Sequence, residues 1–308
     1  MKNYLAIDGG TTNTRVSLVS DGKILATVKL SVGARKSIGG KGELEKAVSE
    51  AISDLLKTQN LSEDDIECAI ASGMITSEYG LCKLDHLVAP VGIAELHNGM
   101  KRTALPEIAN IPFFFIPGVK LSGGDIESTD MMRGEETEVM GIESGEGIYV
   151  LPGSHSKLIR LDADGKITDI VSMLTGEMMA ATVEGTILKD SVTLDTEISL
   201  EAILQGYLYC ENHGVNASLF KVRVMKNLLG ADAASACGFF KGIMLHDEIK
   251  EILKYGAKRV TVGGKRQLRE PTVYLIKALS DTEAIALTDE EVASSTVNGM
   301  IRIYEYKA

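Results

Sequence analysis

Apolar residues recur along this chain in two spacings, one typical of helices and one typical of strands. The clearest helical spacing covers residues 43–56, and its apolar positions are Leu44, Ala47, Val48, Ala51, Ile52 and Leu55. Further helical pattern covers 176–190 and 200–250. Short apolar runs predict strands at 66–70, 112–119, 259–262 and 283–287. Strands that alternate with helices in this way indicate an α/β protein.

One arrangement of apolar and polar positions occurs twice. It reads YLAIDGGTTNTRVSLVSDGKI from Tyr4 to Ile24 and YVLPGSHSKLIRLDADGKI from Tyr149 to Ile167. Each copy predicts a strand, a loop of small residues, a second strand and an Asp-Gly pair. Asp-Gly is the commonest signal for a tight two-residue hairpin turn, so a third strand is expected to follow each copy.

The rest of the chain extends this duplication. Each half reads βββ-α-β-α-β, with extra helices inserted in the second. We predict two similar α/β lobes around an interdomain cleft, since such folds bind ligands at strand ends and domain interfaces. Within the stretch IESGEG at 142–147, the boundary is expected to separate a first lobe, 1–143, from a second, 144–289. A C-terminal helix at about 290–308 could complete the first lobe.

Composition narrows the class of partner. The 308 residues are 44% hydrophobic, and 32 basic against 43 acidic residues give a net charge of −11. This balance argues against nucleic acid or an anionic membrane as the main partner, and no apolar stretch is long enough to span a bilayer. The four cysteines are widely spaced and no signal-like segment opens the sequence, so a reduced cytoplasm is expected.

Three glycine-bearing loops follow apolar runs. The first begins at Asp8, where paired glycines, backbone amides and hydroxyls can cradle a phosphate and a carboxylate can hold the water shell of Mg²⁺. Its binding residues are Gly10, Thr11, Thr12 and Asn13. The second loop contains Gly153, Ser154, His155, Ser156 and Lys157. The third is Gly263 and Gly264, after a predicted strand, where a flat ring or an α-phosphate could approach. A single Gly-Gly pair is equally compatible with an ordinary turn, but three loops at corresponding places favour phosphate binding.

Together these loops resemble the phosphate-1, phosphate-2 and adenosine motifs of the superfamily of acetate and sugar kinases, heat-shock chaperones and actin. Four stretches more closely resemble the 2-dehydro-3-deoxygalactonokinase family: GMITS at 73–77, MRGEET at 132–137, LPGSHSK at 151–157 and MLTGE at 173–177. The resemblance covers nearly the whole chain and implies two ribonuclease-H-like lobes of the actin-like ATPase fold. Gly9 departs from the family pattern, which has an aromatic residue there.

The resemblance implies a function as well. A member of this family phosphorylates the 6-hydroxyl of 2-dehydro-3-deoxy-D-galactonate in galactonate breakdown, with ATP and Mg²⁺ as cofactors. Another 2-keto or aldonic sugar acid is the alternative substrate, and a nucleotide-binding sensor on the same scaffold is the alternative class, because a fold does not determine function. Regulators of the superfamily often carry a DNA-binding segment, whereas here the first strand is expected at Lys2 or Asn3, which favours the enzyme. A homodimer is an open alternative.

Phosphoryl transfer requires positioning, charge neutralisation and a carboxylate that accepts the alcohol proton. Related kinases carry that carboxylate at a helix start, and Glu135 and Glu136 open such a helix here. Acidic residues at a helix start also favour the helix dipole without any catalytic role. Glu135 is the favoured base because Glu136 could instead pair with Arg133 or cap the turn, and Asp130 is the next candidate.

The substrate carboxylate suits arginine, whose guanidinium binds in a bidentate manner. Arg15, Arg35 and Arg133 lie in or near the predicted loops, although surface ion pairing is the alternative for each. The family motifs add Ser77, Thr175, Gly176 and Glu177 to the expected substrate site. His155 is expected to hydrogen-bond in a phosphate loop rather than to transfer a proton. The histidines and cysteines show no zinc spacing.

Overall fold

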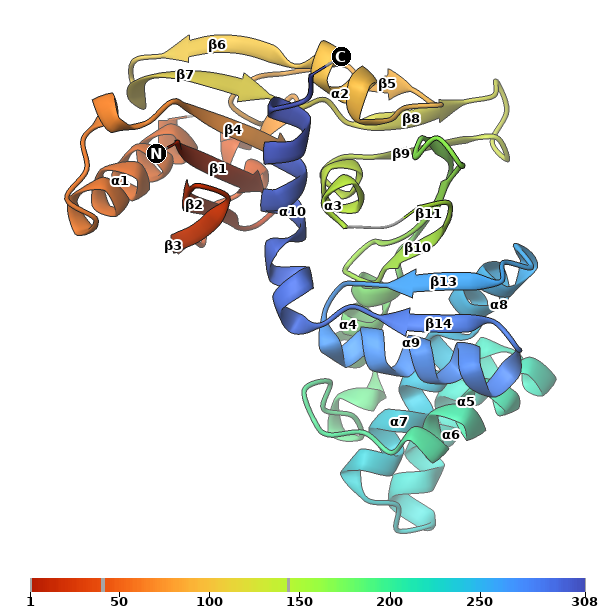
Figure 1. Ribbon diagram of the computed structural model, residues 1–308. Helices are drawn as coiled ribbons and strands as arrows, with labels where there is room; N and C mark the ends of the chain where they lie inside the picture. The colour runs from red at the N-terminus through yellow and green to blue at the C-terminus, as the bar shows by residue number, and fades with distance from the viewer. Residues whose placement is uncertain (1, 40–41, 143–144, 308) are drawn as a thin grey trace. The chain divides into compact units, whose positions relative to one another are not determined.

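The computed structural model describes residues 2–39, 42–142 and 145–307, so the predicted boundary between 143 and 144 lies outside the described residues. The chain forms two compact units (Figure 1). Unit 1 comprises Met1–Glu146, Leu161–Ile170 and Glu290–Ala308. Unit 2 comprises Gly147–Arg160 and Val171–Asp289.

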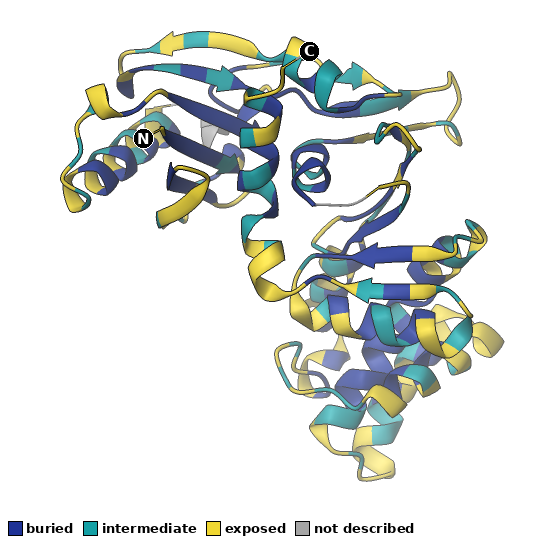
Figure 2. Ribbon diagram, in the orientation of Figure 1, coloured by how far each residue is buried: buried dark blue, intermediate teal, exposed yellow. Residues whose placement is uncertain are grey.

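The main sheet of unit 1 has six strands in the order β3-β2-β1-β4-β7-β6. The strands are β1 (Asn3–Gly9), β2 (Thr14–Ser20), β3 (Lys23–Leu30), β4 (Cys68–Gly73), β6 (Lys101–Leu105) and β7 (Ala109–Phe115). The pairs β1–β4 and β4–β7 are parallel. Central parallel strands are covered on both faces, and Figure 2 shows β1 and β4 buried along their length. Asp21 (φ 46°) and Gly22 (φ 78°) both have positive φ between β2 and β3, so the predicted two-residue turn is confirmed.

Helices cover this sheet with the apolar positions found in the sequence. Helix α1 (Gly42–Thr58) buries Leu44, Val48, Ile52 and Leu55 in the core that the sheet forms, which confirms the helical spacing predicted for 43–56. Helix α10 (Asp289–Tyr304) contributes Tyr304, whose ring lies 5.6 Å from that of Tyr4 and 4.9 Å from that of Phe114.

Unit 1 also contains elements that the apolar pattern did not indicate. A three-stranded sheet, in the order β5-β8-β9, consists of β5 (Leu87–Val88), β8 (Val119–Ser122) and β9 (Thr129–Met132). The single strand predicted at 112–119 is therefore wrong: β7 ends at Phe115 and Val119 begins β8. Pro117 lies between them and has no N–H group for a sheet ladder. The short helices are α2 (Ile93–Gly99) and α3 (Glu135–Gly141), with 3₁₀ turns η1 (Ala34–Gly39), η2 (Glu63–Asp65) and η3 (Met74–Thr76).

The sheet of unit 2 has the order β12-β11-β10-β13-β14. Its strands are β10 (Gly147–Leu151), β11 (Ser156–Leu161), β12 (Ile167–Met173), β13 (Arg259–Val262) and β14 (Glu283–Ala286), and β12 runs across the division between the units. In both sheets the first three strands are neighbours in reverse order, and a strand parallel to the first lies on its other side. The shared order confirms the predicted duplicated α/β fold.

The second Asp-Gly turn differs from the prediction. The Asp162 carbonyl accepts from Gly165 N at 3.0 Å and Asp162 N donates to the Lys166 carbonyl at 3.0 Å, which makes a three-residue loop. Gly165 has φ 72°. The Asp162 carboxylate accepts from Asp164 N and Lys166 N, so a side chain before the Asp-Gly pair selects the longer loop.

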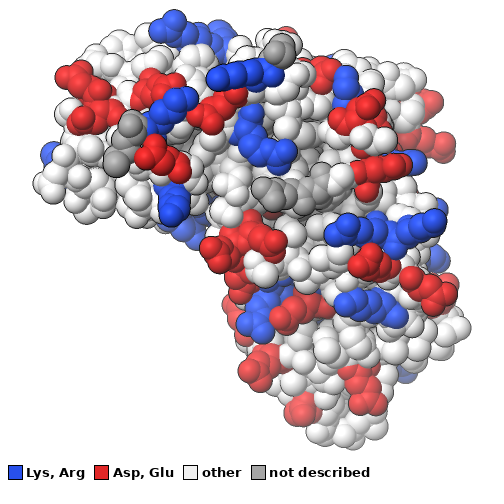
Figure 3. Space-filling model, in the orientation of Figure 1, with Lys and Arg blue, Asp and Glu red and all other residues white. Residues whose placement is uncertain are grey.

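The helices of unit 2 pack around one apolar core. They are α4 (Thr175–Gly185), α5 (Leu200–His213), α6 (Val215–Leu228), α7 (Ala233–Met244), α8 (His246–Lys254) and α9 (Arg266–Leu279), with η4 (Ile187–Asp190). The predicted helical region 176–190 breaks after Gly185 because the Thr186 side chain accepts from Leu188 N and starts η4. None of the helices in the described ranges is long and apolar enough to cross a membrane. On the face drawn in Figure 3, acidic and basic side chains are interspersed.

Candidate functional site

In unit 1, the candidate site begins where β1 ends. Asp8 lies opposite Arg15 in the β1–β2 ladder, and Arg15 Nη1 is 2.9 Å from Asp8 Oδ2. The Asp8 side chain is only 28% exposed. Burial raises the pKa of Asp8, and the adjacent Arg15 guanidinium opposes that rise. The predicted metal-binding carboxylate and one predicted substrate arginine therefore form an ion pair.

The first glycine loop is fixed through its backbone. Gly10 N donates to the Asn13 carbonyl at 2.8 Å, while the Gly10 and Thr11 carbonyls accept from Ala34 N and Arg35 N. Thr11, Thr12 and Asn13 are exposed. These hydrogen bonds to Ala34 and Arg35 fix the backbone of the loop. The side chains of Thr11 and Thr12 remain exposed to solvent. The predicted residue Arg35 contacts this loop through its own amide.

Close backbone contacts bring the start of α3 to the ends of β1 and β4. Gly9 and Gly73 are register partners in these strands. Gly134 has φ 114°, and a Cβ there would lie 3.2 Å from Gly73 Cα. A Cβ at Gly9 would lie 2.6 Å from Ile75 Cβ, so the aromatic residue of the family pattern does not fit here without movement of η3. Gly9 thus allows Ile75 to pack directly on the strand.

The two predicted acids of α3 have different surroundings. Glu136 is fully buried and accepts from Gly134 N at 2.7 Å and from the Thr137 hydroxyl at 3.0 Å. Burial and the neighbouring Glu135 raise the pKa of Glu136 to about 8. Glu135 accepts from Arg133 N at 3.1 Å and is partly exposed. Glu136 therefore caps the turn, which is one of the two alternatives that the sequence offered for it.

A third acid of α3, Glu138, was not predicted as a site residue. Burial and the charges of Glu135 and Asp8 raise the pKa of Glu138 to about 7, while a hydrogen bond from Ser295 and the Arg15 charge lower it. Asp8, Arg15, Glu135 and Glu138 are thus close enough to interact electrostatically. The sequence did contain a signal, because residues three apart on a helix lie on the same face.

The guanidinium of Arg133 is engaged in hydrogen bonds to the backbone of unit 1. Its Nη1 donates to the Thr76 carbonyl at 2.8 Å and lies 2.6 Å from the Thr76 hydroxyl oxygen, and its Nη2 donates to the Leu84 carbonyl at 3.0 Å. The guanidinium therefore fixes the segment that contains Ser77, whose own amide donates to Met74. Asp130 lies in β9 opposite Leu121, and its carboxylate accepts from Met131 N at 2.6 Å.

In unit 2, the second glycine loop docks on the start of α4. Gly176 N donates to the Gly153 carbonyl at 3.2 Å, and Glu177 N donates to the Ser154 carbonyl at 3.0 Å. His155 Nε2 lies 2.9 Å from Glu177 Oε2. Residues predicted to bind phosphate and residues predicted to bind the substrate therefore lie side by side in this loop and helix start. Lys157 lies in β11 and is buried.

The third glycine loop lies beside the second. Gly263 N donates to the Val150 carbonyl at 2.8 Å. Gly264 has φ 69°, and a Cβ there would lie 2.2 Å from the Pro152 carbonyl oxygen. The buried Arg269 donates to the Gly264 carbonyl at 2.8 Å and pairs with Asp289. The predicted phosphate-2 and adenosine motifs thus touch through Pro152 and Gly264.

Direct metal coordination by several side chains is not available in the part of the chain that the structure describes. There, no group of three or more His, Cys, Asp or Glu side chains could hold a metal ion. A single partly buried carboxylate such as Asp8 suits Mg²⁺, which keeps several of its waters and takes few protein ligands.

Comparisons with known proteins identify a family and structures of similar fold. The model of a family described as 2-keto-3-deoxy-galactonokinase matches residues 8–303. A solved structure of a candidate 2-dehydro-3-deoxygalactonokinase from Sinorhizobium meliloti has 22% identity and a TM-score of 0.78, covering 98% of this chain and 100% of the other. No curated protein sequence matches the chain.

More distant structures share the fold. The activator of 2-hydroxyisocaproyl-CoA dehydratase from Clostridium difficile, solved with ADPNP, has 13% identity and a TM-score of 0.52, covering 98% of this chain and 94% of the other. A candidate N-acetylglucosamine kinase from Porphyromonas gingivalis has 16% identity and a TM-score of 0.50, covering 99% and 98%. The fold is that of actin-like ATPases and sugar kinases.

Proposed function

The chain belongs to the 2-keto-3-deoxy-galactonokinase family, and from that premise we propose that it transfers the γ-phosphoryl group of ATP to the 6-hydroxyl of 2-dehydro-3-deoxy-D-galactonate. Membership of the family makes the protein a sugar kinase. The observation that carries the finer proposal is the extent of the family match, which at residues 8–303 includes every candidate site residue.

In unit 1, Glu135 is proposed to accept the proton of the substrate hydroxyl, because it is the partly exposed acid at the start of α3 whereas Glu136 is buried as a cap. Asp8 is proposed to hold Mg²⁺ through water, and the bound ion would neutralise charge on the phosphates. Arg15 limits the negative charge around Asp8. Exposed Thr11, Thr12 and Asn13 are proposed to hydrogen-bond the phosphates.

In unit 2, the loop Gly153–Ser156 is proposed to bind phosphate oxygens, and Gly263 and Gly264 to lie against the adenosine. Thr175, Gly176 and Glu177 are proposed to act through this loop, since two of their amides donate to it. Arg133 is proposed to shape the substrate site by holding the segment before Ser77, and Arg35 to bind the substrate carboxylate with its exposed side chain.

The proposed setting is the cytoplasm, and four free, buried cysteines support a reducing compartment. The proposal is tested by incubating the protein with ATP, Mg²⁺ and a panel of 2-keto and aldonic sugar acids, and by locating phosphate on the product with ³¹P NMR. We expect the highest kcat/KM with 2-dehydro-3-deoxy-D-galactonate and a phosphomonoester at its 6-position. A higher kcat/KM with another sugar acid would overturn the assigned substrate, and nucleotide binding without any phosphorylated product would favour a sensor.

A further inference from the structure

A buried carboxyl group lies beneath the second glycine loop. Glu248 is on α8 and is 1% exposed. Its carboxylate accepts from the Thr175 hydroxyl and also hydrogen-bonds Ser156. Within the described residues, its Oε1 atom has no hydrogen-bond partner. Burial raises the pKa of Glu248, and the two hydroxyls oppose that rise. Burying a carboxyl group costs free energy of folding, and the hydrogen bonds to these two hydroxyls offset part of that cost.

One hydroxyl belongs to the loop itself and the other to the start of α4, which docks on the loop. Ser156 begins β11, and its Oγ lies 3.5 Å from Gly153 N at the opposite end of the loop. Thr175 is the first residue of α4, and the next two amides of that helix donate to the Gly153 and Ser154 carbonyls. One carboxyl group therefore joins both segments. Because the Ser156 oxygen accepts from Gly153 N, its hydroxyl hydrogen is available for the Glu248 carboxylate.

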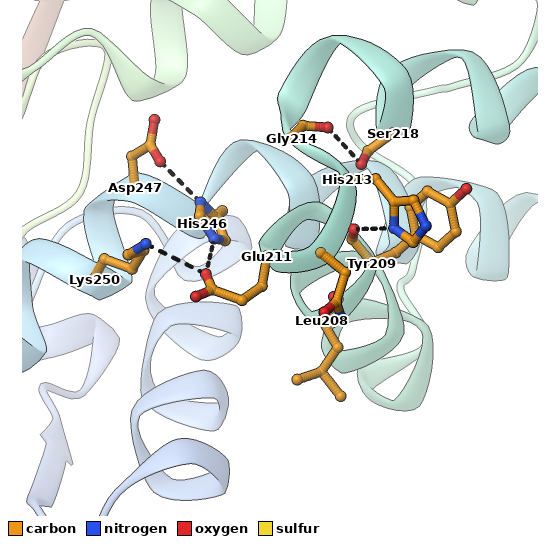
Figure 4. Close-up of polar contacts among 10 residues, drawn as sticks. Leu208, Tyr209, Glu211, His213, Gly214, Ser218, His246, Asp247 and Lys250 are labelled. Carbon is orange, nitrogen blue, oxygen red and sulfur yellow. Dashed lines mark hydrogen bonds and ion pairs between the residues drawn. The ribbon is translucent and has the colours of Figure 1, made fainter.

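The helix that carries Glu248 is itself anchored. His246, the first residue of α8, is buried, and its ring hydrogen-bonds Glu211 of α5 and, at 2.8 Å, Asp247 (Figure 4). Lys250 Nζ lies 3.5 Å from Glu211 Oε2. The contacts of His246 and Lys250 with Glu211 hold α8 on α5, so the helix that carries Glu248 is anchored to the helical core as well as to the loop.

We infer that Glu248 is a positioning residue that holds the loop Gly153–Ser156 in its phosphate-binding shape through Ser156 and Thr175; this rests on the proposed function. A loop that binds phosphate through backbone amides depends on their directions being fixed before the ligand arrives. Loss of the carboxyl would leave two buried hydroxyls to find new acceptors, and the loop would lose its shape.

The test compares Glu248→Ala and Glu248→Gln with two control variants on the same helix. Glu251→Gln removes an acid that pairs with Lys254 outside the network. Ile252→Ala creates a cavity at a buried site and serves as the control for a general loss of stability in Glu248→Ala. The dissociation constant of ADP is measured by calorimetry, together with the KM values for ATP and sugar acid, at a temperature where circular dichroism shows every variant folded.

We expect Glu248→Ala to weaken ADP binding and raise the ATP KM by about tenfold to 100-fold, the range for residues that orient ligand-binding groups, with the sugar-acid KM unchanged. Glu248→Gln keeps one acceptor oxygen and should restore part of the affinity. Both controls should bind ADP like the parent.

Two results would overturn the inference alone: a folded Glu248→Ala variant that binds ADP like the parent, or an equal loss of affinity in Ile252→Ala. A parent protein that binds ADP but phosphorylates no sugar acid would overturn the proposed function, while the ADP affinities would still decide the role of Glu248. A parent that binds no adenine nucleotide would overturn both.

Discussion

Gly141 of α3 and Gly299 of α10 pack against each other's backbone. A Cβ at Gly141 would lie 2.6 Å from Gly299 N and 1.8 Å from the Ser295 carbonyl oxygen, and a Cβ at Gly299 would lie 1.8 Å from the Thr137 carbonyl oxygen. Helix α3 carries Glu135 and Glu138, and Ser295 of α10, whose hydroxyl donates to the Val292 carbonyl at 3.0 Å, lies close enough to Glu138 to affect its pKa. The contact between these two helices therefore determines where the acids of α3 lie.

Gly299→Ala should separate α3 from α10. Since the added methyl group cannot fit against backbone atoms, we expect a loss of roughly 1–3 kcal/mol or more in the free energy of unfolding, measured by urea denaturation, and a lower kcat. Ser294→Ala changes a half-exposed position of α10 and should alter the stability by less than about 0.5 kcal/mol. A Gly299→Ala variant as stable as the Ser294→Ala control would show that the helices can move apart freely.

The fold was predictable from the sequence where local pattern and tertiary packing agree. The apolar face of α1 and the positive-φ turn at Asp21 and Gly22 are local signals, and the duplicated segment indicated two sheets with one strand order. The three-stranded sheet of β5, β8 and β9 was missed because its strands have two to four residues and little alternation. The second turn was mispredicted because Asp162, outside the Asp-Gly pair, selects the longer loop.

The candidate site was predictable only in part. Loop residues carry their own signals of glycine, hydroxyl and charge. The surroundings of Glu136, Arg133 and Glu248 depend instead on segments far away in the sequence, and no local pattern shows which acid is buried. Glu138 was predictable in part. Its position one turn after Glu135 was visible in the sequence, but its approach to Asp8 and Ser295 depends on packing.

Asp8→Asn should abolish turnover while nucleotide binding persists, because the loop amides and hydroxyls remain and only the carboxylate for the Mg²⁺ water shell is lost. The measurements are kcat at saturating Mg²⁺ and the dissociation constant of ADP. Arg15→Gln is the control, since it breaks the same ion pair and keeps the carboxylate. Equal losses of kcat in both variants would assign the effect to the ion pair, and near-parent turnover of Asp8→Asn would remove Asp8 from the metal site.

Glu135→Gln should lower kcat by about 10²–10⁴-fold, the usual effect of losing a general base, with both substrates still bound. Glu136→Gln should keep most of the turnover, because that side chain is buried and acts as a cap. The two variants form a matched pair, measured by kcat and by the dissociation constants of ADP and sugar acid. If both keep kcat within about tenfold of the parent, Glu138 and Asp130 become the next candidates.

The stability of the protein should depend on pH through Glu136. Its pKa is raised from 4.5 to about 8, so between these values the folded state holds a proton that the unfolded state has released. The free energy of unfolding should therefore fall as pH rises through this window, by up to about 1.4 kcal/mol per pH unit. Glu136→Gln stays neutral and should flatten this part of the profile in urea titrations. A parallel profile for parent and variant would contradict the assigned environment.

The contact between Gly264 and Pro152 gives a prediction about nucleotide binding. Gly264→Ala places a methyl group 2.2 Å from the Pro152 carbonyl oxygen, beside the loop Gly153–Ser156. The loop must move to accommodate it, so we expect the ATP KM to rise by about tenfold or more, as misplacement of binding groups by a fraction of an ångström to one ångström has such effects. The ATP KM and the dissociation constant of ADP are measured in a protein shown to be folded.

Gly256→Ala is the matched control for this substitution. Gly256 has φ 57°, close to that of Gly264, but a Cβ there meets no atom within 4 Å. Both variants suffer the same backbone strain, of order 1 kcal/mol for an alanine in the left-handed region, and Gly264→Ala adds the clash with Pro152, so it should be the less stable of the two. Only Gly264→Ala also pushes on the loop. An ATP KM that rises equally in both variants would therefore attribute the effect to general destabilisation, and an unchanged ATP KM in Gly264→Ala would put the adenosine site elsewhere.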